Sequence, residues 1–213
     1  MTVFPEETTC AVCGAKNEFH VLGSFSTFGP PDLDLRPAEM QRSTMPFWIQ
    51  KCPSCGYVAS QLSDPAPITE EWLKAEKYTT CDGINFSSDL SKGFYQQFMI
   101  AIQSKDTEKA FFALLHAAWD CDDWEDDENA KHCRQTACLL AEKLLSSETE
   151  KDENLSLIRA DLLRRTGQFS RLIDEYSNIQ YSDDLLNKII AFQLEKAKAQ
   201  DTGLYRVEDV TRK

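Results

Sequence analysis

Two CxxC pairs are the residues of this sequence whose types and spacing are best suited to chemistry. They occur as Cys10-Ala-Val-Cys13-Gly and Cys52-Pro-Ser-Cys55-Gly. A CxxC turn presents two thiolates from one loop, and the glycine that follows allows the backbone to turn its amides toward the sulfurs. Two such turns supply the ligands of a closed tetrahedral metal site. We therefore predict one structural Zn2+ held by these four cysteines.

A closed metal site of this kind stabilises a fold and does not catalyse a reaction. Four thiolates leave no coordination position for water or substrate. The sequence has no evident pair of catalytic carboxylates, Ser/His/Asp set, glycine-rich phosphate loop or Cys/His nucleophile arrangement. A redox CxxC of the thioredoxin type would need a βαβ pattern, and none surrounds either pair. We expect that the chain is not an enzyme.

The other cysteines and the histidines offer a second metal site as an alternative to packing in the core. The residues concerned are Cys81, Cys121, Cys133, Cys138, His116 and His132. No two of these cysteines have CxxC spacing. Cys133 lies on an apolar stripe with Ala130 and Ala137, which favours packing in the core. His20 lies in an expected strand and could replace a thiolate, although four thiolates already complete the site.

An acidic run over residues 120–128 raises the possibility of a calcium site, because it holds seven carboxylates in nine residues. An EF-hand loop starting at residue 120 would need glycine at its sixth position and glutamate at its twelfth, where the sequence has Glu125 and Lys131. We instead expect a solvated loop whose last acids favour the N-terminus of the following helix. Trp119 and Trp124 would anchor this loop to the core.

The composition indicates an ordinary water-soluble protein. The 213 residues are 42% hydrophobic, which is enough for one medium domain or two small ones. The net charge of -12 disfavours nonspecific binding to nucleic acid or to anionic membranes. No signal peptide is visible at the N-terminus, and no stretch approaches the roughly 20 apolar residues of a membrane span. We expect a cytoplasmic protein, in which eight cysteines are not a disulfide framework.

All eight prolines lie at or before Pro67, which predicts two domains. Proline interrupts helices and central strands, so residues 1–67 should form a turn-rich β domain and residues 68–213 a helical one. Strands are expected over residues 18–22 and 47–51, each beside a cysteine pair, so that both pairs lie on hairpin turns. The fold class expected is α+β and mostly α, with a small zinc ribbon at the N-terminus.

An inserted loop over residues 24–45 is expected inside this ribbon, because the gap between the cysteine pairs exceeds the usual 15 to 20 residues or so. Within it, the proline-bounded stretch 29–37 should be stiff and extended. Asp32, Asp34 and Arg36 alternate there with two leucines. These three residues are candidate contacts for a partner. In the alternative interpretation the leucines pack on the ribbon and the charges are solvated.

The part of the chain after Pro67 predicts a stack of antiparallel helices. Thr69 is a candidate N-cap, Gly167 separates two helices and Gly203 closes the last one. The helices are expected near residues 70–78, 90–102, 107–120, 129–146, 152–166, 169–178 and 183–200.

Two stretches of this helical part are similar to the tetratricopeptide repeat. The stretch 165–176 has the glycine of the turn between the helices and an aromatic residue two positions later. A looser copy starts with Leu115 and Trp119, continues with Ala130 and Ala137, and has a longer acidic loop between its helices. We expect two hairpins like those of this repeat and no regular solenoid.

Several motifs together resemble an uncharacterised bacterial family, domain of unknown function 2225. They are the two CxxCG turns, the stretch Phe47-Trp-Ile-Gln-Lys before the second turn with a tyrosine after it, Leu114-Leu-His-Ala-Ala-Trp119, and the Arg-Arg-Thr-Gly-Gln-Phe turn. The resemblance covers most of the chain, up to the helix ending near Gln200. It implies a zinc ribbon fused to a helical tail similar to the tetratricopeptide repeat, and it implies no reaction.

Three classes of function fit these features. The first is an interaction or scaffold protein, in which zinc fixes the ribbon and the helical hairpins bind a partner protein or peptide. The second is a ribbon that contacts nucleic acid or the transcription and translation machinery, although its basic residues are sparse. The third is a redox sensor in which oxidation of the thiolates releases zinc, or an enzyme of unknown class.

Overall fold

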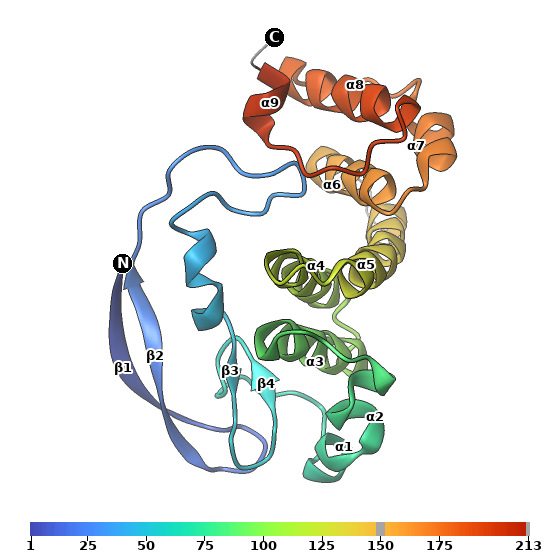
Figure 1. The fold of residues 1–213 in the computed structure, drawn as a ribbon. Helices are drawn as coiled ribbons and strands as arrows, with labels where there is room; N and C mark the ends of the chain where they lie inside the picture. Colours follow the sequence, from blue (N-terminus) through green and yellow to red (C-terminus); the bar gives the residue numbers. More distant parts are fainter. Residues whose placement is uncertain (148–151, 212–213) are drawn as a thin grey trace. The chain divides into compact units, whose positions relative to one another are not determined.

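The structure is a computed structural model that describes residues 1–147 and 152–211 (Figure 1). The chain is α+β and mostly helical, with short antiparallel strands near the N-terminus and helices after them, as the sequence predicts. It divides into two compact units, Met1–Thr27 with Glu39–Cys133 and Phe28–Ala38 with Arg134–Lys213. These units do not follow the division at residue 67 that composition suggests. In the described residues no helix is both long and apolar enough to cross a bilayer.

The strands of the first unit form two separate hairpins. Strand β1 (Thr2–Thr9) pairs antiparallel with β2 (Lys16–Ser24), and β3 (Gln50–Lys51) pairs antiparallel with β4 (Val58–Ala59). Each cysteine pair lies in the turn of one hairpin, as predicted. The expected strand over residues 47–51 is only two residues long, because its first residue ends a 3-10 helix.

The first unit continues with short helices and a long antiparallel pair. Its elements are the 3-10 helix η1 (Arg42–Phe47), α1 (Glu70–Lys74), α2 (Glu76–Thr79), the 3-10 helix η2 (Cys81–Gly83), α3 (Asp89–Gln103) and α4 (Thr107–Asp123). Thr69 caps α1 as predicted, because its side chain accepts a hydrogen bond from the backbone N–H of Trp72 at 3.3 Å. Helices α3 and α4 lie side by side (Figure 1) and bury Phe94, Phe111 and Leu114 completely.

Three-residue turns join α3 to α4 and α4 to α5 (Asp127–Ser147). In each turn the middle residue, Lys105 or Glu125, has a left-handed backbone conformation, with φ of 58° and 56°. The third residue, Asp106 or Asp126, accepts a hydrogen bond from a backbone N–H of the next helix. The prediction of a long acidic loop between α4 and α5 is therefore wrong, since most of those acids belong to the two helices.

The second unit contains most of α5 and the helices after it. These are α6 (Glu153–Arg165), α7 (Phe169–Tyr176), α8 (Asp184–Lys198) and α9 (Val207–Thr211). Gly167 separates α6 from α7 with φ of 78°, as predicted. Gln200, with φ of 56°, and not Gly203, is the left-handed residue that follows α8. The core between α6, α7 and α8 includes Leu162, Leu172 and Ile190.

Candidate metal centre

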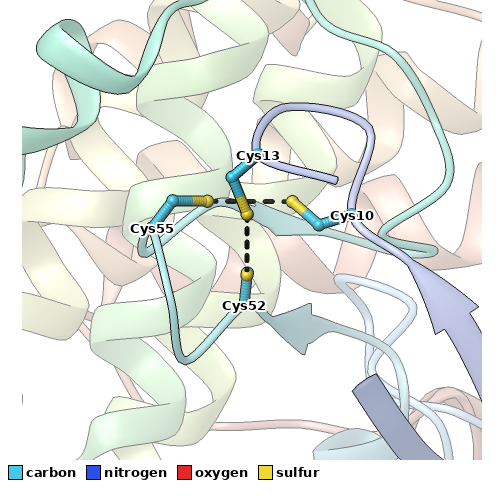
Figure 2. Close-up of side chains that lie close together, drawn as sticks. All are labelled: Cys10, Cys13, Cys52 and Cys55. Atoms are coloured by element: carbon cyan, nitrogen blue, oxygen red, sulfur yellow. Dashed lines mark hydrogen bonds between the residues drawn. The ribbon is translucent and has the colours of Figure 1, made fainter. Parts of the chain in front are cut away.

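The sulfur atoms of Cys10, Cys13, Cys52 and Cys55 converge on one point (Figure 2). All four lie within 4.8 Å of one another. The distance from Cys10 Sγ to Cys55 Sγ is 3.7 Å, and the distance from Cys13 Sγ to Cys52 Sγ is also 3.7 Å. Each of these two contacts joins one cysteine pair to the other, so the cluster ties the β1–β2 hairpin to the β3–β4 hairpin.

The two turns that carry the cysteines have the same backbone hydrogen bonds. In the first turn, Cys10 N–H donates to Ala15 O and Gly14 N–H donates to Cys10 O, each at 2.9 Å. In the second turn, the N–H groups of Cys52 and of the glycine after Cys55 make the equivalent bonds at 2.8 and 2.9 Å. Both glycines have a left-handed conformation, with φ of 71° and 79°, which glycine adopts without strain.

The sulfur geometry fits a single tetrahedral ion. A Zn–S bond of about 2.3 Å places tetrahedral ligands about 3.8 Å apart, close to the 3.7 Å of the two contacts. A disulfide would need an S–S distance of about 2.0 Å, and all eight cysteines are free thiols. The residues present therefore fit the predicted zinc site, with Cys10, Cys13, Cys52 and Cys55 as its ligands.

Without a cation, the thiols of Cys52 and Cys55 do not ionise alike, and the pKa of one is lowered while that of the other is raised. Burial would raise the pKa of Cys52, but hydrogen bonds from the backbone of Cys55 and Ser54 outweigh it and hold that pKa at about 7. Burial raises the pKa of Cys55 far above its usual value, against a hydrogen bond from the backbone of Tyr57. The arrangement stabilises the thiolate of Cys52 and resists that of Cys55, because negative sulfurs this close repel one another. A bound dication would remove that repulsion.

Two residues outside the motif, neither of them predicted from the sequence, support the cluster. Asn17 Nδ2 lies 3.0 Å from Ala15 O in the first turn and 3.9 Å from Cys52 Sγ in the second. The buried Tyr78 of α2 donates its hydroxyl hydrogen to Gly56 O at 2.7 Å. Asn17 follows the first CxxC pair by four positions, which is a signal that could have been used. Tyr78 had no such signal.

The remaining cysteines pack in the interior, as the stripe around Cys133 indicates. Cys81, Cys121, Cys133 and Cys138 are all buried, and the four-cysteine cluster is the one group of metal-binding geometry within residues 1–147 and 152–211. His20 lies on β2 with an exposed side chain and does not belong to that group.

Two members of the acidic run, Asp120 and Asp126, accept hydrogen bonds from backbone N–H groups at or near the starts of helices. The buried Asp120 accepts a hydrogen bond from Ser91 N–H at the start of α3, at 2.9 Å. Asp126 accepts from the N–H groups of Ser87 and Asn129. Trp119 is buried, as predicted, but Trp124 is 61% exposed and does not anchor the run.

The candidate partner contacts of the inserted loop lie in the interior of the second unit. Asp32, Asp34 and Arg36 are 2%, 1% and 2% exposed. Asp34 Oδ2 lies 3.7 Å from Arg134 Nη2 and 3.9 Å from Arg165 Nη1. These charges are thus neither solvated nor presented to a partner, which corrects both interpretations of the stretch.

Backbone contacts hold the same segment in the second unit. Leu33 N–H donates to Tyr205 O at 2.9 Å, and Val207 N–H donates to Pro31 O at 3.1 Å. Of the two leucines, Leu33 is buried and Leu35 is 46% exposed. The segment therefore packs against the C-terminal part of the chain.

Comparison with protein families places most of the chain in one of them. A family model described as an uncharacterized protein conserved in bacteria (DUF2225) matches residues 3–201. The matched range includes all four cysteines and the helices through α8. Comparisons with curated proteins and with solved structures found no match.

Proposed function

The chain belongs to the bacterial family of domain of unknown function 2225, and from its own site we propose that it is a non-catalytic, zinc-stabilised interaction protein of the cytoplasm. The convergence of four cysteine sulfurs within 4.8 Å of one another is the observation on which this proposal rests. Four protein ligands complete a tetrahedral zinc site, so the metal would stabilise the two hairpins and take no part in a reaction.

Zinc is the metal that we propose for chemical reasons. Thiolate ligands in tetrahedral geometry favour zinc or iron over the hard ions calcium and magnesium. The two sulfur contacts of 3.7 Å leave room for one ion and not for a cluster of several irons. A structural zinc also suits a ribbon whose strands bury little apolar surface.

The interaction role is supported by how the helices follow one another. Three-residue turns join α3 to α4 in the first unit and α6 to α7 in the second, and the helices of each pair contact one another as a hairpin. Repeat proteins such as those with tetratricopeptide repeats bind partner proteins or peptides on helical hairpins of this kind. We propose a protein or peptide as the partner of these helices.

The metal is tested by measuring zinc and iron by mass spectrometry in the purified full-length protein. We expect one zinc per chain in the wild type and less than half of that in Cys52→Ser. Cys121→Ala is the matched control, because Cys121 is buried outside the cluster and its loss should leave zinc unchanged. Iron in place of zinc, or full zinc in Cys52→Ser, would contradict the proposed site.

The interaction role is tested by affinity capture from the native host with wild type, Cys52→Ser and Cys121→Ala. A captured protein is then purified and its binding to each variant is measured directly. We expect a partner that binds wild type and Cys121→Ala at least tenfold more tightly than Cys52→Ser. A protein that binds all three variants equally would show that zinc does not maintain the binding surface.

A further inference from the structure

A cavity of about 390 Å³ in the first unit is lined by groups whose hydrogen bonding is incomplete. It lies beside α3 and α4 and includes His116, Gln97, Ser60, Trp48 and Phe112 in its lining. Its volume falls within the range of small-molecule sites, which is roughly 300 to 1,000 Å³. None of these residues belongs to the cysteine cluster, so the cavity is separate from the metal centre.

The imidazole of His116 is surrounded by aromatic rings and forms no hydrogen bond within the part of the chain that the structure describes. The rings of Trp48, Trp119 and Phe94 lie with their centroids 4.9, 5.0 and 5.1 Å from that of His116. Burial lowers the pKa of His116 to about 4, so the ring is neutral at physiological pH. A neutral imidazole offers one N–H donor and one nitrogen acceptor.

Gln97 supplies a second incomplete group. Its side chain is 5% exposed, and its Nε2 donates to Ser60 Oγ at 3.1 Å. Its Oε1 accepts no hydrogen bond from the described residues. This amide oxygen is therefore available to accept a hydrogen bond from a ligand N–H group.

The walls and rim of the cavity further restrict the shape and charge of a ligand that could bind there. Trp48 is fixed by the hydrogen bond from its Nε1 to Thr44 Oγ1 at 2.9 Å, and Phe112 is 37% exposed, so both rings are available for stacking. The rim has two acids, Asp106 and Glu108, and one base, Lys109. This balance disfavours an anion.

We propose that this cavity binds an uncharged planar nitrogen heterocycle of the aminopurine kind. Its ring stacks between Trp48 and Phe112, its exocyclic N–H donates to Gln97 Oε1, and a ring nitrogen pairs with His116. The cavity thereby recognises the base-like part of a ligand and excludes an unshielded phosphate group.

The probe is adenine, added to the full-length zinc-loaded protein at neutral pH, with binding followed by calorimetry and by the NMR signals of His116. A ligand of this size should bind with a Kd on the order of 1 mM or tighter. We expect N6,N6-dimethyladenine, which has no exocyclic N–H, to bind at least tenfold more weakly, and benzoate not to bind. No saturation by about 10 mM adenine would overturn the proposal.

Variants separate recognition from loss of the fold. His116→Phe keeps a ring in the aromatic cluster and removes both nitrogens, and we expect it to weaken adenine binding at least tenfold. Phe112→Ala removes one wall at an exposed position and should weaken binding without affecting zinc content or melting temperature. Leu139→Ala, at a position 60% exposed on α5, is the control and should change nothing. Equal affinity for adenine and its dimethyl form, or for wild type and His116→Phe, would show only a nonspecific apolar hollow.

Discussion

The β1–β2 hairpin and the α3–α4 pair are both antiparallel two-element units of the same part of the chain, but they are stabilised differently. Of the residues in the two strands only Thr8 is buried, whereas nine residues of α3 and ten of α4 are buried. A two-stranded hairpin without a core is marginal in water, while a helix pair with a shared apolar face is not. The comparison indicates that the strands depend on the four cysteines and the helices do not.

Removal of the metal should give the largest effect and tests this comparison directly. A structural zinc contributes on the order of 10 to 16 kcal/mol of apparent binding free energy in small domains. With a strong chelator, we expect amides of β1 and β2 to lose protection from hydrogen exchange while amides of α3 and α4 retain it. Exchange is measured by mass spectrometry of peptic fragments. Simultaneous loss of protection in both pairs would abolish the distinction.

A buried charge tests the same contrast in the second unit, whose described residues include no metal-binding group of side chains. Asp34→Ala removes the carboxylate that lies near the buried Arg134 and near Arg165. Removing one member of a buried ionic group costs about 3 to 5 kcal/mol, so the midpoint of urea unfolding should fall accordingly. Asp174→Ala, at an exposed position on α7, should change the free energy by less than about 0.5 kcal/mol. Similar effects of both substitutions would mean that Asp34 does not stabilise this unit.

Acid should weaken the α3–α4 pair through His116. The pKa of His116 is about 4 in the folded protein and about 6.5 when unfolded. Between these two values the imidazole is protonated in the unfolded chain and neutral in the folded one. Stability is therefore complete above pH 6.5 or so and falls by roughly 3 kcal/mol as the pH decreases toward 4. Asp106, Glu108 and Lys109 share its cavity and are retained in His116→Phe.

The measurement is the free energy of unfolding of wild type and His116→Phe between pH 7 and pH 4. As the pH falls, we expect the free energy of unfolding of the wild type to decrease more than that of His116→Phe. A constant difference over this range would show that His116 does not titrate in the way described.

Single substitutions in the turns should give the smallest effects. They compare the turn of the α3–α4 pair directly with the turn of the β1–β2 hairpin. Lys105 connects α3 to α4 with φ of 58°, and Gly14 lies in the β1–β2 turn with φ of 71°. A left-handed conformation costs a non-glycine residue about 1 kcal/mol. Lys105→Gly should thus raise the melting temperature by a few degrees, and Gly14→Ala should lower it. In the chelated protein Gly14→Ala should have no effect, because its hairpin is already lost.

Elements that are marked by an apolar period or by a motif of fixed spacing could be predicted from the sequence. The cysteine cluster follows from two CxxC turns, and the long helices follow from their apolar period and from Gly167. Strand β1 could not be predicted, because Pro5 and two glutamates interrupt any alternation and the strand forms by pairing with β2.

Features that depend on distant residues could not be predicted. The burial of Asp34 requires Arg134 and Arg165, and nothing in the sequence links these residues to one another. Charged residues are expected at the surface unless a partner is known. The hydrogen bond from Tyr78 to Gly56 and the cavity at His116 also arise only when separate helices and hairpins come together.

The position of residues 28–38 between the cysteine pairs has a consequence for the order of events during synthesis. The four-cysteine cluster is complete in sequence once Cys55 has been made, while Tyr205 and Arg206, which contact this segment, follow about 150 residues later. At about 5 to 20 residues per second, that interval lasts roughly 8 to 30 seconds. The nascent chain can bring its four cysteines together early, whereas Asp32 and Asp34 between them gain their arginine neighbours only after those later residues have left the ribosome.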